Sequence, residues 1–582
     1  MNRISLKIVG ASGQGIDSVG EILAKALKRS GYCVFGYREY PSLIKGGHAS
    51  YQLDISDERI ESTETMVNVV IALNHHGLEH NITDVKPGGI FAHSTAGWKF
   101  PDADKQRIEK QSLQMICLPI EETLKTLNAK PILGNVLLAS FVWAVLGQKA
   151  EPLKTMVGER FAKKKDLLDL NMQCIDAGFA LQAKNAGVTV QLPKPKAEFR
   201  KQMLLTGSKA MGLGAVAAGV RLYAGYPMTP SSPLLTYIAS IQNETGMVIK
   251  QAEDEITAAQ IVSGAMYMGT RALTATSGGG FDLMSETVSL NAIIENPTVF
   301  VLAQRPGPAT GLPTWTGQGD LLMAVHTSHG EFARCVMSVS DSDDAFTLMN
   351  DAFNLAEKYQ ISVIVLTDKQ IAEALYTQPL YDMKKIAIDR GSLVTDAAKL
   401  RKLKATDRYD ATAKDGVSPR WLPGSDAPTF VAQGDEHSGD GSVEEGAVNA
   451  NAQMEKRMKK AEALKAGLPE PELYGAEQPE VLLVGWGSTK SVVIDALKTD
   501  ALKDKKIGYL HYRYLWPLKT EKLQKLAKSA KKTILIEGNF QGQLGLLVRQ
   551  ECGLEMKTKI LKYDGRPFFV DELTQKISSL LS

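Results

Sequence analysis

The amino-acid sequence predicts a multidomain α/β protein built from layers of parallel sheet and helix. Short apolar runs that resemble strands alternate with helical patterns along most of the chain, which is typical of parallel sheets. Several of these runs end in turns rich in glycine. The length of 582 residues is more than one hydrophobic core usually supports, so we expect three or four domains.

Composition narrows the class of protein. Hydrophobic residues make up 44% of the chain and charged residues 23%, which are ordinary values for a soluble globular protein. The formal net charge of +2 argues against a partner nucleic acid, which usually requires a strong basic excess. Residues 4–9 resemble a strand rather than a signal peptide, and the most apolar stretch, residues 133–146, is too short to span a membrane. We therefore expect a cytoplasmic protein with no membrane segment, in which residues 133–146 form a buried helix.

Neither the cysteines nor the histidines predict a metal site in this chain. The five cysteines are scattered and include no Cys-x-x-Cys pair, so we expect reduced thiols rather than an iron–sulfur cluster or a structural zinc. His75, His76 and His80 include a pair at helical spacing. We find no acidic or cysteine partner at matching spacing and interpret them as surface histidines.

The first predicted unit covers residues 1–190. Its first strand leads into a glycine-rich turn at residues 10–16 and then into an amphipathic helix, an arrangement typical of a phosphate-binding turn. The glycine spacing departs from the dinucleotide fingerprint, which disfavours a flavin- or nicotinamide-dependent dehydrogenase. Gly13, Gln14 and Gly15 are candidates for ligand binding, although tight packing alone would also explain such a turn.

A loop at residues 40–48 places Lys45 beside two flexible glycines. An exposed lysine is usually only solvated, and contact with an acidic ligand is the functional alternative. Residues 191–200 alternate proline and lysine, which suits an extended linker. The second unit then runs over residues 201–375, with predicted strands at 271–276, 298–303 and 362–367.

An apolar run of the second unit leads into the segment Tyr226-Pro227-Met228-Thr229-Pro230. Proline disfavours a helical conformation in the residue before it, so Thr229 is predicted to be a helix N-cap with Pro230 at the first helical position. Such a helix start attracts anions. A rigid capped turn without a ligand is equally consistent with the pattern.

Two charged side chains of the second unit are further candidates. Glu255 opens a predicted helix, where acids also favour the helix dipole without any role in binding. Arg305 is the only charged residue in the Pro/Gly loop at residues 304–314, which follows a strand and lies at the edge where sites of α/β folds are found. An arginine there can bind a carboxylate with two nitrogens or hold loop carbonyls in place.

The remainder of the chain forms two regions. Residues 376–475 are dominated by charged and small polar side chains, which predicts an extended and partly mobile excursion. Residues 476–582 return to alternating strands and helices, which predicts a third, smaller α/β unit.

The order of these features resembles that of the 2-oxoacid:ferredoxin oxidoreductases, which decarboxylate 2-oxoacids onto coenzyme A and reduce ferredoxin. The Tyr-Pro-Met-Thr-Pro segment is similar to the family's substrate-binding segment, and the acid-x-Glu-apolar-x-Ala-Ala pattern that contains Glu255 is similar to a helix start that contacts thiamine diphosphate. The Gly-Gln-Gly turn and the Lys-Gly-Gly loop resemble the family's gamma domain. The resemblance implies a fused chain with a gamma domain at 1–190, a linker at 191–200, a thiamine-diphosphate pyrimidine-type domain at 201–375, a polar excursion at 376–475 and a transketolase C-terminal-like domain at 476–582.

The resemblance also implies roles for individual residues. Glu255 would contact the aminopyrimidine ring of thiamine diphosphate, and Thr229 would hold the carboxylate of the oxoacid. Arg305 and Lys45 would hold a second acid group or coenzyme A, although the family more often has arginine at the position of Lys45. The other implied binding residues are Tyr226 for the substrate, and Pro227, Gly13, Gln14 and Gly15 for the cofactors.

The resemblance further implies a partner subunit. The triplet Gly439-Asp440-Gly441 lacks the strand and the later asparagine of the diphosphate-binding metal motif. We therefore expect a beta subunit that carries this motif, Mg²⁺ and a [4Fe-4S] cluster, with thiamine diphosphate shared between the two chains, ferredoxin as the electron partner and a dimer of alpha–beta heterodimers. The fused layout and the loop at 304–314 favour 2-oxoglutarate, whose two acid groups would match two basic side chains. Pyruvate-type or broad specificity, and a non-catalytic scaffold, are the alternatives.

Overall fold

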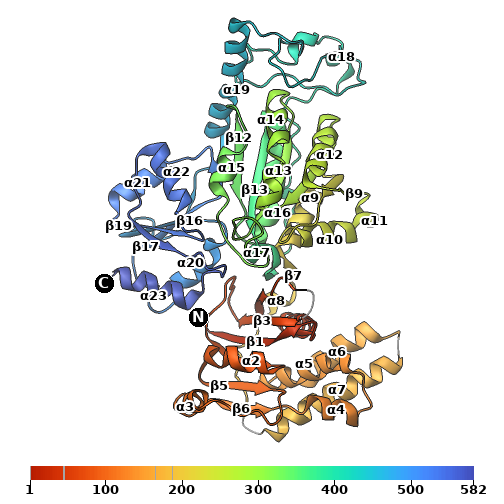
Figure 1. The fold of residues 1–582 in the computed structure, drawn as a ribbon, viewed down its shortest axis with the longest axis vertical. Helices are drawn as coiled ribbons and strands as arrows, with labels where there is room; N and C mark the ends of the chain where they lie inside the picture. Colours follow the sequence, from red (N-terminus) through yellow and green to blue (C-terminus); the bar gives the residue numbers. More distant parts are fainter. Residues whose placement is uncertain (1, 44–45, 164, 186–187, 582) are drawn as a thin grey trace.

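The computed structural model describes residues 2–43, 46–163, 165–185 and 188–581. Lys45 lies outside these residues. The described strands form sheets of eight, seven and five strands. In Figure 1 the eight-stranded sheet lies at the bottom, the seven-stranded sheet in the centre and the five-stranded sheet at the left.

The first sheet has the order β6-β5-β4-β1-β3-β2-β14-β7. Strands β1, β4, β5 and β6 are parallel, whereas β3, β2, β14 and β7 each run antiparallel to the preceding neighbour in that order. Its strands are β1 (Arg3–Ser12), β2 (Cys33–Glu39), β3 (Gly46–Ser56), β4 (Val67–Ala72), β5 (Val85–His93), β6 (Gln114–Cys117), β7 (Met203–Thr206) and β14 (Leu375–Gln378). The last two come from beyond residue 190, so this sheet joins the first and second units.

Helices cover the first sheet. The apolar stretch predicted as a buried helix is α5, whose residues from Val136 to Val145 are all buried, so that prediction is confirmed. The helices of this part are α1 (Ile16–Ser30), α2 (His75–Asn81), α3 (Asp102–Lys110), α4 (Ile120–Thr126), α5 (Gly134–Val145), α6 (Ala150–Phe161), α7 (Lys165–Lys184) and α8 (Ala197–Arg200), with 3₁₀ turns η1 (Ile82–Asp84) and η2 (Pro131–Leu133).

The second sheet has the order β18-β12-β13-β11-β10-β8-β9 and is parallel except for β18. The strands predicted at 271–276, 298–303 and 362–367 are confirmed as β10, β11 and β13, and the sequence reading missed β9 and β12. The strands are β8 (Leu222–Gly225), β9 (Val248–Gln251), β10 (Ala272–Thr276), β11 (Thr298–Gln304), β12 (Arg334–Ser338), β13 (Ser362–Asp368) and β18 (Tyr514–Trp516). The helices are α9 (Gly207–Ala217), α10 (Ser232–Ser240), α11 (Gln242–Thr245), α12 (Glu255–Tyr267), α13 (Gly278–Leu283), α14 (Ser285–Ile293), α15 (Leu321–His326), α16 (Ser342–Tyr359) and α17 (Lys369–Glu373).

The third sheet has the order β15-β17-β16-β19-β20, with only β15 antiparallel to its neighbour. This confirms the small parallel layer predicted near the end of the chain. Its strands are β15 (Glu472–Gly475), β16 (Val481–Trp486), β17 (Ile507–Tyr512), β19 (Lys532–Glu537) and β20 (Thr558–Leu561), and its helices are α20 (Thr489–Leu497), α21 (Glu521–Ser529), α22 (Gln543–Cys552) and α23 (Val570–Leu581).

The polar segment between β14 and β15 is packed rather than extended throughout. It contains the 3₁₀ turns η3 (Met383–Lys385) and η4 (Ala405–Asp407). Its helices, α18 (Ala397–Leu400) and α19 (Ala447–Gly467), lie at the top of the molecule in Figure 1. Lys456 and Lys460 of α19 both form buried ion pairs with Glu295. Burial alone would raise the pKa of Glu295, but the two lysines hold it below its usual range. Composition alone does not reveal such buried ion pairs.

Among the described residues, no single helix has the length and apolar character needed to cross a membrane. The pair Ile120–Thr126 and Pro131–Val145 reaches that length and composition only in combination, across a bend of 119°.

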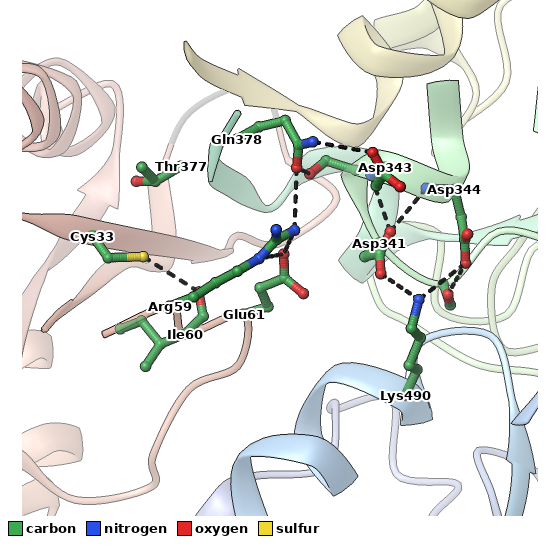
Figure 2. Close-up of polar contacts among 12 residues, drawn as sticks. Cys33, Arg59, Ile60, Glu61, Asp341, Asp343, Asp344, Thr377, Gln378 and Lys490 are labelled. Carbon is green, nitrogen blue, oxygen red and sulfur yellow. Dashed lines mark hydrogen bonds and ion pairs between the residues drawn. The ribbon is translucent and has the colours of Figure 1, made fainter. Parts of the chain in front are cut away.

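Charged side chains from all three parts of the chain meet at one junction (Figure 2). Lys490 of α20 points toward the second unit and lies 2.7 Å from Asp341 Oδ2 and 3.4 Å from Asp344 Oδ2, with all three side chains buried. Arg59 of the first unit pairs with Glu61 at 2.6 Å. Arg59, Glu61, Asp341 and Lys490 line a groove of about 580 Å³. Because the opposite charges satisfy one another, we interpret the junction as structural.

Replacing Lys490 tests this interpretation. Lys490→Ala would leave Asp341 buried without its cation and Asp344 with Arg513 alone, so we expect the free energy of unfolding in urea to fall by about 3–5 kcal/mol. Lys498→Ala is the control, because Lys498 follows the same helix but its side chain is 40% exposed, and its ion pair with Asp495 should contribute about 0–1 kcal/mol. Equal losses for the two variants would contradict the structural role of the junction.

Candidate functional site

Three loops of the second unit meet at one edge of its sheet. Strands β8, β10 and β11 are parallel neighbours and end at Gly225, Thr276 and Gln304. The carboxyl ends of parallel strands lie at the same edge, where ligands bind in α/β folds. The loops that follow carry Thr229 and Arg305, so two of the predicted site residues share this edge.

The turn after β8 differs from its prediction in one respect. The helix α10 begins at Ser232, with Ser231 in the N-cap position, so the prediction that Thr229 caps the helix is wrong. A turn intervenes because the backbone N–H groups of Ser231 and Ser232 both donate to the carbonyl oxygen of Met228, at 2.8 and 3.1 Å. The hydroxyl of Thr229 has no hydrogen-bond partner in the described part of the chain. It is therefore available to a ligand.

Glu255 is the first residue of α12, and its side chain is buried. Asp254 caps this helix by accepting a hydrogen bond from the backbone N–H of Thr257 at 2.7 Å, so Glu255 is not needed as a cap. Among the described residues, Oε1 of Glu255 has no hydrogen-bond partner. Buried polar atoms are nearly always hydrogen-bonded in native proteins, so this oxygen calls for a ligand or a partner chain.

The glycine run that opens α13 makes room in front of Glu255. A Cβ atom at Gly280 would lie 2.7 Å from Glu255 Oε1 and would overlap Thr276 Oγ1. The hydroxyl of Thr276 in turn donates to Met228 Sδ at 3.8 Å. Thr276 therefore lies between Glu255 and the turn that holds Thr229. Both border the same space.

Arg305 also borders this space, because its side chain contacts the backbone of Thr229. Its Nη1 donates to the carbonyl oxygen of Thr229 at 2.6 Å, which is the structural role that the sequence left open. In the described part of the chain, Nε and Nη2 have no partner, so the remaining donors are available to an acid group. Burial lowers the pKa of Arg305, and the charge of Asp320 opposes that shift.

Asp320 is a site residue that sequence reasoning missed. Its Oδ2 is buried without a hydrogen-bond partner among the described residues and would lie 3.0 Å from a Cβ atom at Gly278. Burial, with the nearby charge of Asp282, raises the pKa of Asp320 to about 6. The hydroxyl of Ser277 is also buried and unpaired there. The only sequence signal was the run Gly317-Gln318-Gly319 before Asp320, and tight packing alone would also explain these glycines.

The glycine turn of the first unit borders a second space. Gly13, Gln14 and Gly15 line a cleft of about 770 Å³ at the carboxyl end of β1. Gly15 has φ 81°, and a Cβ atom there would overlap Asn135, so glycine is required at this position. The N-terminus of α1 has no side-chain cap, which leaves its N–H groups available to an anion.

Contacts between loops connect the space at Glu255 with the cleft at Gly13, Gln14 and Gly15. The hydroxyl of Thr314, in the loop that begins at Arg305, donates to the carbonyl oxygen of Tyr40 at 2.7 Å. Tyr40 begins the loop that leads to β3, and Gly46 of β3 pairs with Ser12 beside the glycine turn. Tyr40 and Gly46 therefore link the Arg305 loop to the neighbourhood of the cleft.

Comparison with known proteins gives two family matches. Residues 213–460 match a family described as pyruvate flavodoxin/ferredoxin oxidoreductase, thiamine diphosphate-binding, and residues 5–181 match one described as pyruvate ferredoxin/flavodoxin oxidoreductase. The first match includes the Thr229, Glu255 and Arg305 loops, and the second includes the cleft.

Individual relatives agree with these matches. A 2-oxoacid:ferredoxin oxidoreductase subunit alpha from a Sulfolobus species is 32% identical over 100% of this chain and 97% of its own length. A 2-oxoglutarate oxidoreductase subunit KorA from Mycobacterium tuberculosis is 26% identical over 100% of this chain and 92% of its own. The structure of a 2-oxoglutarate:ferredoxin oxidoreductase from Magnetococcus marinus, with 2-oxoglutarate, coenzyme A and succinyl-CoA bound, superimposes with a TM-score of 0.92 at 30% identity and covers both chains completely. The chain belongs to the 2-oxoacid:ferredoxin oxidoreductase family, as an alpha subunit.

Proposed function

We propose that this chain is the fused gamma–alpha subunit of an enzyme that oxidatively decarboxylates 2-oxoglutarate with coenzyme A. The products would be succinyl-CoA, carbon dioxide and reduced ferredoxin. The single observation that carries the proposal is the buried, unpaired Oε1 of Glu255 in front of a glycine run. Thiamine diphosphate, when bound, supplies the chemistry that cleaves the carboxyl group.

The carboxyl group of Glu255 suits the aminopyrimidine ring of the cofactor. A carboxyl group held in a space from which side chains are absent can exchange a proton with a ring nitrogen, and burial strengthens that interaction. Glu255 would hold this proton, and the turn that contains Pro227 would lie beside the ring. The glycines at 278–280 allow the ring to approach the backbone closely.

Thr229 and Arg305 fit the two ends of a dicarboxylic oxoacid. The unpaired hydroxyl of Thr229 would donate to the carboxylate next to the oxo group, with Tyr226 at its exposed side. The free donors of Arg305 would bind the distal carboxylate, because guanidinium nitrogens match a carboxylate with two parallel hydrogen bonds. The bond from Nη1 to Thr229 would hold the two groups at a fixed separation.

The surface around Glu255 suits a partner subunit. Large apolar side chains there are exposed, and such patches usually mark an interface. They are Tyr226, Ile256 and Leu283, which are 39%, 47% and 49% exposed. We propose that a beta subunit covers them, carries the diphosphate-binding motif with Mg²⁺ and the [4Fe-4S] cluster, passes electrons to ferredoxin, and assembles with this chain as a dimer of heterodimers.

The cleft beside Gly13, Gln14 and Gly15 would take the phosphates of coenzyme A on the side of α1 rather than on the side of α4, where Glu121 and Glu122 line it. The uncapped start of α1 supplies N–H donors, and the loop that contains Lys45 would add a positive charge. Because that loop also contacts the Arg305 loop through Tyr40, coenzyme A bound here could reach toward the Glu255 space.

Glu255→Gln tests the proposed role of the carboxyl group. We expect the turnover of the alpha–beta complex to fall by at least about 100-fold, because an amide cannot exchange the proton. Assembly with the beta subunit, measured by gel filtration, should be unchanged. Glu253→Gln, which alters an exposed acid two residues away, is the control and should retain normal turnover. Near-normal turnover of Glu255→Gln would remove Glu255 from the mechanism and favour a scaffold role.

The substrate assignment is tested by comparing kcat/KM for 2-oxoglutarate and for pyruvate. We expect the wild-type complex to prefer 2-oxoglutarate. Arg305→Met should lower kcat/KM for 2-oxoglutarate by about 10- to 150-fold, the value of one or two hydrogen bonds to a charged group, and should lower that for pyruvate by a smaller factor, because both substrates lose the contact that Arg305 makes with Thr229. A wild-type preference for pyruvate would contradict the assignment, and equal losses for both substrates would assign Arg305 to loop structure alone.

Gln14→Glu tests the coenzyme cleft. Glutamate can still accept the hydrogen bonds that Gln14 Oε1 accepts from the Ala11 N–H and from Asn74, so the turn should persist. The added negative charge should repel phosphate and raise KM for coenzyme A by about 3- to 10-fold. Decarboxylation of the 2-oxoacid in the absence of coenzyme A should be unchanged, as should all constants of Gln114→Glu, which alters an exposed glutamine outside the cleft. An unchanged KM for coenzyme A would exclude the cleft.

A further inference from the structure

Histidine side chains and one acid gather on the outer face of α2, outside the site described above. His76, Glu79 and His80 occupy positions i, i+3 and i+4 of this helix, and all three are exposed. One potential ligand atom from each lies within 4.8 Å of the others. Glu79 is the acidic partner at helical spacing that these histidines were predicted to lack, so that prediction is wrong.

A further histidine, from a different element, borders this cluster. The ring of His48, on β3, packs against that of His80 with 5.6 Å between the centroids. Nδ1 of His48 is buried and has no hydrogen-bond partner among the described residues. The three atoms that lie within 4.8 Å of one another nevertheless come from His76, Glu79 and His80, so these three side chains are the potential ligands.

The opposite face of α2 holds these side chains on a fixed support. Gly77 lets the helix pack closely on β1, because a Cβ atom there would lie 2.9 Å from Val9 Cγ2. Asn74 caps the helix by accepting a hydrogen bond from the Gly77 N–H at 2.8 Å. Leu78 and Asn81 are buried on the same face. The helix therefore presents its ligand face outward without needing an ion to fold.

We propose that α2 forms a binding site for a divalent transition-metal ion of the Zn²⁺ class, with His76, Glu79 and His80 as the ligands. Imidazole nitrogens with one carboxylate are a donor set typical of Zn²⁺ and unlike the all-oxygen sets that Ca²⁺ and Mg²⁺ prefer. Ligand atoms that bind one ion at about 2.1 Å are at most about 4.2 Å apart, so small rotations of exposed side chains complete the site.

The site would lie next to the cleft of the first unit. Asn74, which begins α2, donates from Nδ2 to Gln14 Oε1 at 3.0 Å, and Gln14 lines that cleft. His75 stacks near Trp98 with 6.2 Å between the ring centroids. An ion on α2 therefore has a fluorescent side chain close by.

Zinc titration of the chelator-stripped alpha–beta complex tests the proposal. In competition with a chromophoric chelator, we expect the wild type to bind one tight equivalent on this chain, with affinity reduced at least tenfold in His76→Ala and in His80→Ala. His329→Ala removes an exposed histidine elsewhere and should bind Zn²⁺ as the wild type does. The proposal is overturned if the double variant His76→Ala/His80→Ala retains the tight equivalent, or if His329→Ala loses as much affinity.

A second measurement locates the ion without using enzyme turnover. Cu²⁺ has the same ligand preferences and quenches nearby tryptophan fluorescence. It should therefore quench the part of the wild-type emission that comes from Trp98, which is absent from Trp98→Phe. That part should persist in His329→Ala and disappear in the double variant. Quenching of Trp98 that survives the double substitution would mean that the ion binds elsewhere.

Discussion

A buried carboxylate that lacks a partner is the constraint on which the site depends. Leaving a charged group unpaired in the interior costs several kcal/mol, so a fold that keeps one must gain from it elsewhere. Here Asp254 takes over the helix cap, and the glycine run of α13 keeps side chains away from Glu255 Oε1. Asp320 Oδ2 is unpaired at the same edge. The described chain thus contains an incomplete polar site, which is what a subunit that shares its cofactor requires.

The same edge is connected to the first unit by short, specific contacts. Arg305 bonds to Thr229, the Arg305 loop bonds to Tyr40, and the following strand pairs beside the glycine turn. These contacts hold the loops of the second unit and the glycine turn of the first in fixed positions, which matters for the proposed sites because positioning errors of about 1 Å can cost 100-fold in rate.

The sequence predicted those features that depend on local patterns. Buried parallel strands such as β11 and β13 are continuous apolar runs, and the motifs around Thr229 and Glu255 are contiguous in sequence. It did not predict contacts between distant segments. Strands β7 and β14 have only four residues each, which is too short to show a hydrophobic periodicity. Asp320 becomes a candidate site residue only through its position over Gly278. The cap at Thr229 was wrong because a further turn, which the proline pattern alone does not reveal, precedes α10.

The path from β13 through α17 to β14 has a mechanical consequence. Helix α17 spans only Lys369–Glu373, and β14 enters the eight-stranded sheet directly after it, paired with β2 and β7. A hinge would need a flexible segment here, and this stretch is instead fixed by backbone hydrogen bonds on both sides of β14. A displacement of the Gly13–Gly15 cleft relative to Glu255 would strain these strand connections, so the two units are coupled elastically rather than free to swing against each other.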